Sequence, residues 1–128
     1  MLRGEPCVIN GDGETSRDFC FVANAVQANL RAALVDDAAA LNQVFNVAVG
    51  QRTTLMQLHG LLAAALTRLK PALQVKPAQM RAFRDGDVRH SLADISKAGS
   101  RLGYEPSHDV RAGLEQTAPW YLAQTSGT

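Results

Sequence analysis

The sequence predicts an α/β fold with a few short strands and about four helices. The first observation is that short apolar segments, several rich in β-branched residues, alternate with segments in which apolar residues recur at the helical period. The second is length, because 128 residues suit one domain of the usual roughly 100–200 residues. We expect a domain over residues 1–124 and a disordered tail over residues 125–128. The strands are few and short, which indicates part of a larger fold.

The chain is expected to begin with two extended segments. Pro6–Asn10 (PCVIN) predicts a short strand, and Gly11-Asp12-Gly13 predicts the turn that ends it, because glycine tolerates positive φ. Phe19–Val22 predicts a second extended segment.

The first helix is expected to follow directly. Asn24 can cap its N-terminus, a position that favours asparagine. Val26, Leu30 and Leu34 recur every four residues and form an apolar stripe. We expect the helix to end near Val35.

A strand and a second helix are expected in the middle of the chain. Val44–Val49 (VFNVAV) is apolar and β-branched, which indicates a buried strand. Thr54 and Gln57 have the spacing of a capping box. The leucines of Leu55–Leu69 follow the helical period, and Pro71 stops the helix.

A strand, a loop and a short helix are expected next. Pro77–Phe83 predicts a short strand, and Arg84–His90 predicts a polar loop. Asp94 can cap a short helix that Gly103 closes in the left-handed conformation.

The last helix is expected to begin after Asp109, which can cap it. Pro119 must kink or end this helix, because proline lacks an N–H and clashes with the preceding turn. Trp120 and Tyr121 are expected to pack against the domain.

Composition limits the partners. The net charge is +1, from 13 basic and 12 acidic residues, so no basic field is available to hold a nucleic acid. No apolar run approaches the ~20 residues of a membrane span, and no signal peptide is recognisable. Cys7 and Cys20 form neither a disulfide framework nor a zinc motif. We expect reduced, packed thiols in a cytoplasmic protein without a metal site.

Two loops carry arginines that could bind an anion. Arg17 follows the glycine turn, and its planar guanidinium suits phosphate oxygens; a salt bridge with Asp18 or another carboxylate is the alternative. Arg84 precedes Asp85-Gly86-Asp87, and the carboxylate of Asp87 could accept hydrogen bonds from ribose hydroxyls. A solvated charged loop is the alternative there. Arg89 could assist with phosphate or pair with Asp87.

The two loops and the first strand are more informative together. Two arginines from distant loops could converge on one diphosphate, whose charge needs two counter-charges. The backbone of Val8–Asn10 would then offer N–H and C=O groups to a uracil edge.

These segments resemble a known family. Gly11-Asp12-Gly13 with Arg17-Asp18-Phe19 resembles the GDG…RDF/Y segment of extended short-chain dehydrogenase/reductases that act on nucleotide sugars. Arg84–Asp87 is similar to their RxGD element, Asp94–Ala98 to their D-x-S-K-A helix start, and Leu102–Pro106 to their LGY/W-x-P segment. The order is kept along almost the whole chain. Within this NAD-dependent epimerase/dehydratase family, the motif sequences most resemble those of UDP-N-acetylglucosamine 4-epimerases of the polysaccharide-biosynthesis type.

The resemblance implies roles for individual residues. Arg17 and Arg84 would contact the UDP diphosphate from two sides, and Asp87 would hold the uridine ribose. Val8 and Asn10 would meet the uracil through their backbone groups. No catalytic, cofactor-binding or metal-binding residue is implied.

Two motifs of that family are missing from these 128 residues. There is no GxxGxxG turn, and Tyr104 and Tyr121 are followed four residues later by His108 and Thr125 rather than lysine. We therefore expect the N-terminal NAD-binding domain to be absent and the chain alone to bind no NAD and to have no epimerase activity.

The resulting hypothesis is the C-terminal UDP-sugar-binding portion of an NAD-dependent nucleotide-sugar 4-epimerase of the UDP-N-acetylglucosamine or UDP-glucose type. Dehydratase chemistry is the alternative reaction. A stand-alone or partner-dependent UDP-sugar-binding module and an inactive truncated product also remain open. The full-length enzyme would use NAD and could be a homodimer, and the missing domain could come from a partner chain.

Overall fold

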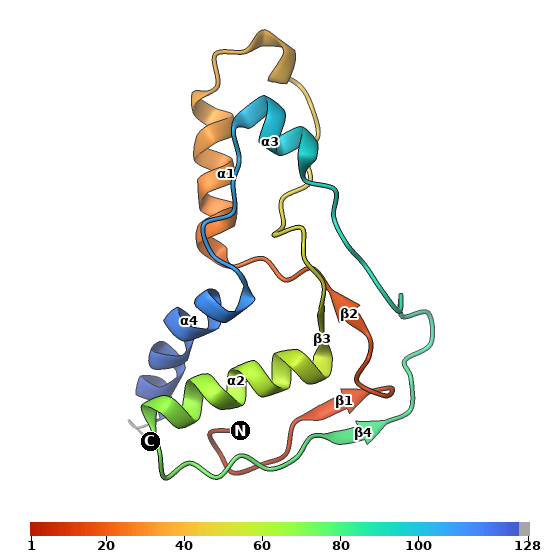
Figure 1. The fold of residues 1–128 in the computed structure, drawn as a ribbon, viewed down its shortest axis with the longest axis vertical. Helices are drawn as coiled ribbons and strands as arrows, with labels where there is room; N and C mark the ends of the chain where they lie inside the picture. Colours follow the sequence, from red (N-terminus) through yellow and green to blue (C-terminus); the bar gives the residue numbers. More distant parts are fainter. Residues whose placement is uncertain (126–128) are drawn as a thin grey trace.

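Short strands lie between the helices along much of the chain in the computed structural model, which describes residues 1–125 (Figure 1). Their order over these residues is β1 (Val8–Asn10), β2 (Ser16–Arg17), α1 (Val22–Leu34), the 3-10 turn η1 (Ala38–Ala40), β3 (Thr53–Thr54), α2 (Leu55–Leu69), β4 (Gln79–Arg81), α3 (Ser96–Leu102) and α4 (Val110–Thr125). The protein is thus mixed α/β with few strands, as predicted. Thr125 is the last residue of α4, and the rest of the predicted tail lies outside the described residues.

The strands form two small sheets. β1 pairs with β4 in parallel, with Asn10 opposite Arg81. β2 pairs with β3 in the antiparallel sense, with Arg17 opposite Thr53. An isolated bridge joins Ser16 to His90, so β2 also contacts the loop that follows β4. The strand predicted within Pro77–Phe83 is therefore confirmed.

α2 begins immediately after β3 because Thr54 caps it. The Thr54 side chain accepts the N–H of Gln57 at 3.1 Å, and the Gln57 side chain accepts the N–H of Thr54 at 2.8 Å, which is the predicted capping box. α2 packs against α4 through Ala65, Leu66 and Ala118, all buried. In Figure 1, α2 runs beside β1, and α4 lies at the far end of α2.

A second buried cluster lies at the other end of the molecule, where α1 and α3 pack side by side (Figure 1). It contains Ala28, Ala40, Ala98, Leu102 and Tyr104. α3 ends at Gly103, whose φ of 64° is left-handed, as the sequence predicted.

The start of α1 differs in part from the prediction. Phe21 has the extended backbone expected of Phe19–Val22, but α1 already begins at Val22, and its cap residue is Phe21 rather than Asn24. Asn24 is instead fully buried, and its Oδ1 accepts the backbone N–H groups of Ser107 and His108 at 2.9 and 3.1 Å. It joins α1 to the segment before α4.

The strand predicted at Val44–Val49 is absent. The segment has no strand partner among the described residues, and Val44 is 85% exposed. A strand requires a ladder of hydrogen bonds to a neighbour, and an apolar, β-branched sequence cannot supply one alone.

Two further expectations about individual residues are corrected, and a third is narrowed. Pro119 was expected to kink or end α4, and α4 continues past it, so the helix does not end there. Trp120 and Tyr121 are 60% and 55% exposed and contact each other edge-to-face instead of packing inward. Cys7 and Cys20 are free thiols, but Cys20 is exposed. No helix in residues 1–125 combines the length and apolar character needed to cross a membrane.

Candidate functional site

The site starts where β1 and β4 end. Because the two strands are parallel, the chain leaves both at the same edge. The Gly11 N–H donates to the Arg81 carbonyl at 2.8 Å, which continues the ladder into the turn. Gly11 has a φ of 87°, and a Cβ there would lie 2.4 Å from the Phe83 ring. Glycine therefore allows the loop after β4 to lie directly on the turn after β1.

The loop after β4 is attached to β2 by backbone hydrogen bonds. The Ser16 N–H donates to the Arg89 carbonyl at 2.9 Å, and the Ser91 N–H donates to the Ser16 carbonyl at 3.2 Å. Ser16 Oγ also lies 2.9 Å from His90 Nδ1. Since Arg17 follows Ser16, this attachment brings the loop against Arg17.

Arg17 is held by three acceptors. Its Nη1 donates to the carbonyls of Ser16 and Arg89 at 2.8 and 3.4 Å, and its Nη2 lies 2.5 Å from Asp87 Oδ1. The side chains of Arg17 and Asp87 are 28% and 37% exposed, so the pair stands at the surface of a pocket. Two residues predicted to bind different parts of one ligand are thus paired with each other.

Asp18 does not pair with Arg17. Its carboxylate accepts the backbone N–H groups of Val49, Gly50 and Ala93 at 3.0, 2.9 and 3.4 Å. Asp18 therefore joins the chain after β2 to two distant segments, and the salt-bridge partner of Arg17 is Asp87.

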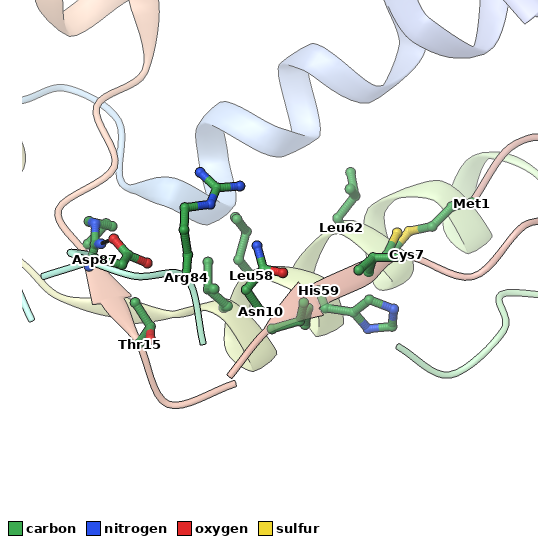
Figure 2. Close-up of a pocket in the computed structure, with 13 residues that line it drawn as sticks. Met1, Cys7, Asn10, Thr15, Leu58, His59, Leu62, Arg84 and Asp87 are labelled. Carbon is green, nitrogen blue, oxygen red and sulfur yellow. Dashed lines mark hydrogen bonds and ion pairs between the residues drawn. The ribbon is translucent and has the colours of Figure 1, made fainter. Parts of the chain in front are cut away.

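Arg84 differs from Arg17 because its guanidinium has no hydrogen-bond or ion-pair partner within residues 1–125. Its backbone carbonyl accepts the Asp87 N–H at 3.1 Å, a turn that keeps Arg84 and Asp87 close. Arg84 and Asp87 stand at one end of the pocket in Figure 2.

One pocket of about 460 Å³ contains all five residues that the sequence proposed. Its lining consists of Met1, Cys7, Val8, Ile9, Asn10, Thr15, Arg17, Leu55, Leu58, His59, Leu62, Arg84 and Asp87. Figure 2 shows Arg84 and Asp87 at one end and Met1, Cys7 and Leu62 at the other. The pocket therefore has a cationic end and an apolar end.

β1 presents a free edge to this pocket. The carbonyl of Cys7 and the N–H of Gly11 bond across to β4. Backbone groups alternate along a strand, so those of Val8 and Asn10 point to the opposite edge. No strand pairs with that edge in the described chain, and Val8 is 45% exposed.

A second ion pair, which the sequence did not predict, joins the loop after β4 to the turn after β1. Arg89 Nη2 lies 2.6 Å from Asp12 Oδ2, and its guanidinium stands over the Phe83 ring at 5.2 Å. Arg89 thus pairs with Asp12, not Asp87. The Arg89 hydrogen bond, followed by the Glu14 N–H, lowers the pKa of Asp12 below 3.8. The partners are 77 positions apart in the sequence, so no local signal predicts this contact.

The apolar wall of the pocket comes from α2, which was predicted as a helix but not as part of the site. Leu55, Leu58 and Leu62 recur at the helical period and share one face. His59 also lines the pocket, and its Nε2 is buried without a hydrogen-bond partner in the described structure. Within residues 1–125, no cluster of His, Cys, Asp or Glu could hold a metal ion.

Solved structures of two UDP-sugar 4-epimerases are similar to this chain over almost its whole length. UDP-glucose 4-epimerase from Thermotoga maritima, solved with UDP-glucose, has a TM-score of 0.78 and 37% identity, with 98% of this chain and 37% of that chain covered. UDP-N-acetylglucosamine 4-epimerase from Methanobrevibacter ruminantium, solved with UDP-N-acetylmuramic acid, has a TM-score of 0.82 and 35% identity, with 96% and 36% covered. The structure has the fold of part of an extended short-chain dehydrogenase/reductase of the NAD-dependent epimerase/dehydratase class.

Sequence comparison identifies the family. The model described as GDP-mannose 4,6 dehydratase matches residues 1–117, and the chain belongs to this family. A dTDP-glucose 4,6-dehydratase from Haemophilus influenzae is 31% identical over 99% of this chain and 38% of its own length. A UDP-glucose 4-epimerase from Mycolicibacterium smegmatis is 31% identical over 94% of this chain and 36% of its own length. The chain thus spans about a third of the length of its curated relatives.

Proposed function

We propose that this chain is the UDP-sugar-binding portion of an NAD-dependent nucleotide-sugar 4-epimerase. The observation that supports the proposal is the pocket in which Arg17, Arg84 and Asp87 meet beside the free edge of β1. The relatives include epimerases and dehydratases, so dehydratase chemistry is the alternative reaction.

The geometry suggests how each group would act. Arg84, with all its guanidinium donors available, would bind one side of the diphosphate, and Arg17 would bind the other. Asp87 would accept hydrogen bonds from the ribose hydroxyls. The uracil edge would pair with the backbone of Val8 and Asn10, as an added strand pairs with a sheet edge. The chain's role is to bind and orient the nucleotide.

The residues present do not form a dinucleotide cradle. α1 begins at Val22 after Phe21, which provides no side-chain cap, and α2 begins at Leu55 after the Thr54 capping box. No helix of residues 1–125 follows a glycine-rich GxxGxxG turn. We therefore propose that the part that binds NAD lies outside these 128 residues, in the same polypeptide or in a partner chain. The chain alone is expected to have no NAD-dependent epimerase activity, and turnover of UDP-glucose by it would contradict this.

Titration calorimetry with UDP tests the binding proposal. Arg17→Ala and Arg84→Ala should each weaken UDP binding by about tenfold or more, because each removes a charged hydrogen-bond donor. Arg101→Ala is the matched control, since Arg101 lies in α3 outside the pocket and is 50% exposed. Binding should also weaken with salt. Absence of heat from the unmodified chain would contradict the proposal, and tighter binding of dTDP than UDP would contradict UDP as its nucleotide.

A further inference from the structure

The ion pair between Arg17 and Asp87 has a consequence for ligand selection. Asp87 accepts one N–H of Nη2 of Arg17, while Nη1 donates to two backbone carbonyls. Any phosphate that binds Arg17 at Nη2 must approach a carboxylate that already neutralises this guanidinium and repels a second anion. Arg84 has no such competitor within the described residues, so the two arginines are not equivalent.

We propose that Asp87 makes this pocket selective for nucleoside diphosphates over inorganic diphosphate by masking Arg17. The inference rests on the proposed function. In the free chain, Asp87 neutralises Arg17, and only Arg84 is available to an incoming anion. Binding of a nucleoside diphosphate is an exchange, in which phosphate replaces carboxylate on Arg17 and the released carboxylate accepts the ribose hydroxyls.

The exchange is favourable only for a ligand that carries both a diphosphate and ribose hydroxyls. Inorganic diphosphate can displace Asp87, but it leaves the carboxylate beside an anion without a hydrogen-bond donor. A ribose next to the diphosphate supplies two hydroxyl donors to the Asp87 carboxylate. These hydrogen bonds replace the one that Asp87 loses when phosphate displaces it from Arg17. Asp87 therefore lowers the affinity of the pocket for inorganic diphosphate but not for nucleoside diphosphates.

The loop geometry supports this arrangement. The Asp87 N–H donates to the Arg84 carbonyl at 3.1 Å, so the carboxylate is held next to both arginines. The Arg17 guanidinium is fixed by Ser16 and Arg89 and does not depend on Asp87 alone. Removal of the Asp87 charge should therefore expose Arg17 without releasing it.

Calorimetry with UDP, inorganic pyrophosphate and 2′,3′-dideoxyuridine diphosphate tests the proposal on the unmodified chain, Asp87→Asn and Asp87→Ser. Both variants should bind pyrophosphate about fivefold or more tightly than the unmodified chain, and the preference for UDP over pyrophosphate should fall about tenfold. Asp85→Asn is the matched control, because it removes the same charge from the same loop outside the ion pair. It should leave pyrophosphate affinity within about twofold.

The unmodified chain gives a second readout that needs no variant. It should bind dideoxyuridine diphosphate about tenfold more weakly than UDP, a difference that Asp87→Asn abolishes. Equal affinities for these two ligands, or unchanged pyrophosphate affinity in both Asp87 variants, would overturn the masking role while Arg17-dependent UDP binding still upheld the proposed function. If neither the unmodified chain nor any variant binds UDP, the proposed function fails and this inference fails with it.

Discussion

Asp12 and Arg89 form an ion pair of 2.6 Å that joins the turn after β1 to the loop after β4. Their side chains are 47% and 45% exposed, so the pair contributes little to overall stability. Its effect is positional, because Arg84 and Asp87 lie in the loop that it holds. This contact links the glycine turn of the sequence motif to the charged end of the pocket.

The pKa of Asp12 should report whether this pair forms. Arg89→Gln removes the largest cause of the lowered pKa, so the midpoint should rise toward the ordinary value of 3.8. Since the folded-state pKa is lowered, the pair stabilises the fold above pH 3.8 and is lost as the pH falls through the folded-state pKa. NMR titration of the carboxyl carbon measures the midpoint. Arg101→Gln is the control, and an unshifted midpoint in Arg89→Gln would mean that the pair does not form.

A buried hydrogen bond joins Tyr104 to the backbone of Ala48. Tyr104 is 3% exposed, and its hydroxyl donates to the Ala48 carbonyl at 2.6 Å. Tyr104→Phe leaves that buried carbonyl without its donor and should lower the free energy of unfolding by about 1–3 kcal/mol. Urea denaturation measures the loss. Tyr121→Phe, at a site 55% exposed, should change stability far less; equal losses would contradict the assignment.

The same tyrosine predicts a pH dependence. Burial, followed by the proximity of Cys20 and Asp18, raises the pKa of Tyr104 from 10.0 to about 12. The folded-state pKa is raised, so the stabilisation is complete below pH 10.0 and is lost as the pH rises through about 12. The stability advantage of the unmodified chain over Tyr104→Phe should shrink across this range. Urea denaturation at several pH values tests it, and a constant difference would refute it.

Two helical glycines should respond in opposite directions to alanine. A Cβ on Gly113 in α4 would lie 2.8 Å from the Phe21 Cβ, an atom fixed to the backbone, so Gly113→Ala should destabilise by about 1–3 kcal/mol. A Cβ on Gly60 in α2 meets nothing within 4 Å. Gly60→Ala should therefore stabilise by about 0.5–1 kcal/mol through helix propensity. Thermal unfolding compares the two, and stabilisation by both would show that Phe21 does not pack on Gly113.

Local sequence signals predicted the helices well. The Thr54–Gln57 capping box involves residues three apart, and Gly103 acts through its own φ, so neither depends on distant contacts. Asn24 shows the limit of this reasoning. Its side chain suits a helix cap, but hydrogen bonds to residues more than 80 positions away place it inside α1. Burial and distant partners decided its role.

In the candidate site, too, residue chemistry was predictable from the sequence, whereas contacts between distant residues were not. The arginines and Asp87 were identified from residue chemistry and motif resemblance, and the structure places them in one pocket. A salt bridge of Arg17 was one alternative that the sequence left open, but its partner was not predictable, because Asp18 is adjacent and Asp87 lies 70 residues away. Asp18 was unavailable because it satisfies three backbone N–H groups. Competition among partners is a property of the folded chain.

The apolar stripe of α1 gives the last prediction. Val26, Leu30 and Leu34 are 52%, 59% and 77% exposed, as expected if a partner surface normally covers part of the helix. The chain spans 38% and 36% of the length of the two curated relatives named above, so such a surface could come from a further part of the fold. Without it, the chain should self-associate as its concentration rises, because burial of apolar side chains is favourable. Light scattering across a concentration series measures this. Leu30→Gln should shift association to higher concentration, whereas Leu92→Gln, at a loop site 53% exposed, should not. A monomer at every concentration would show that this face needs no cover.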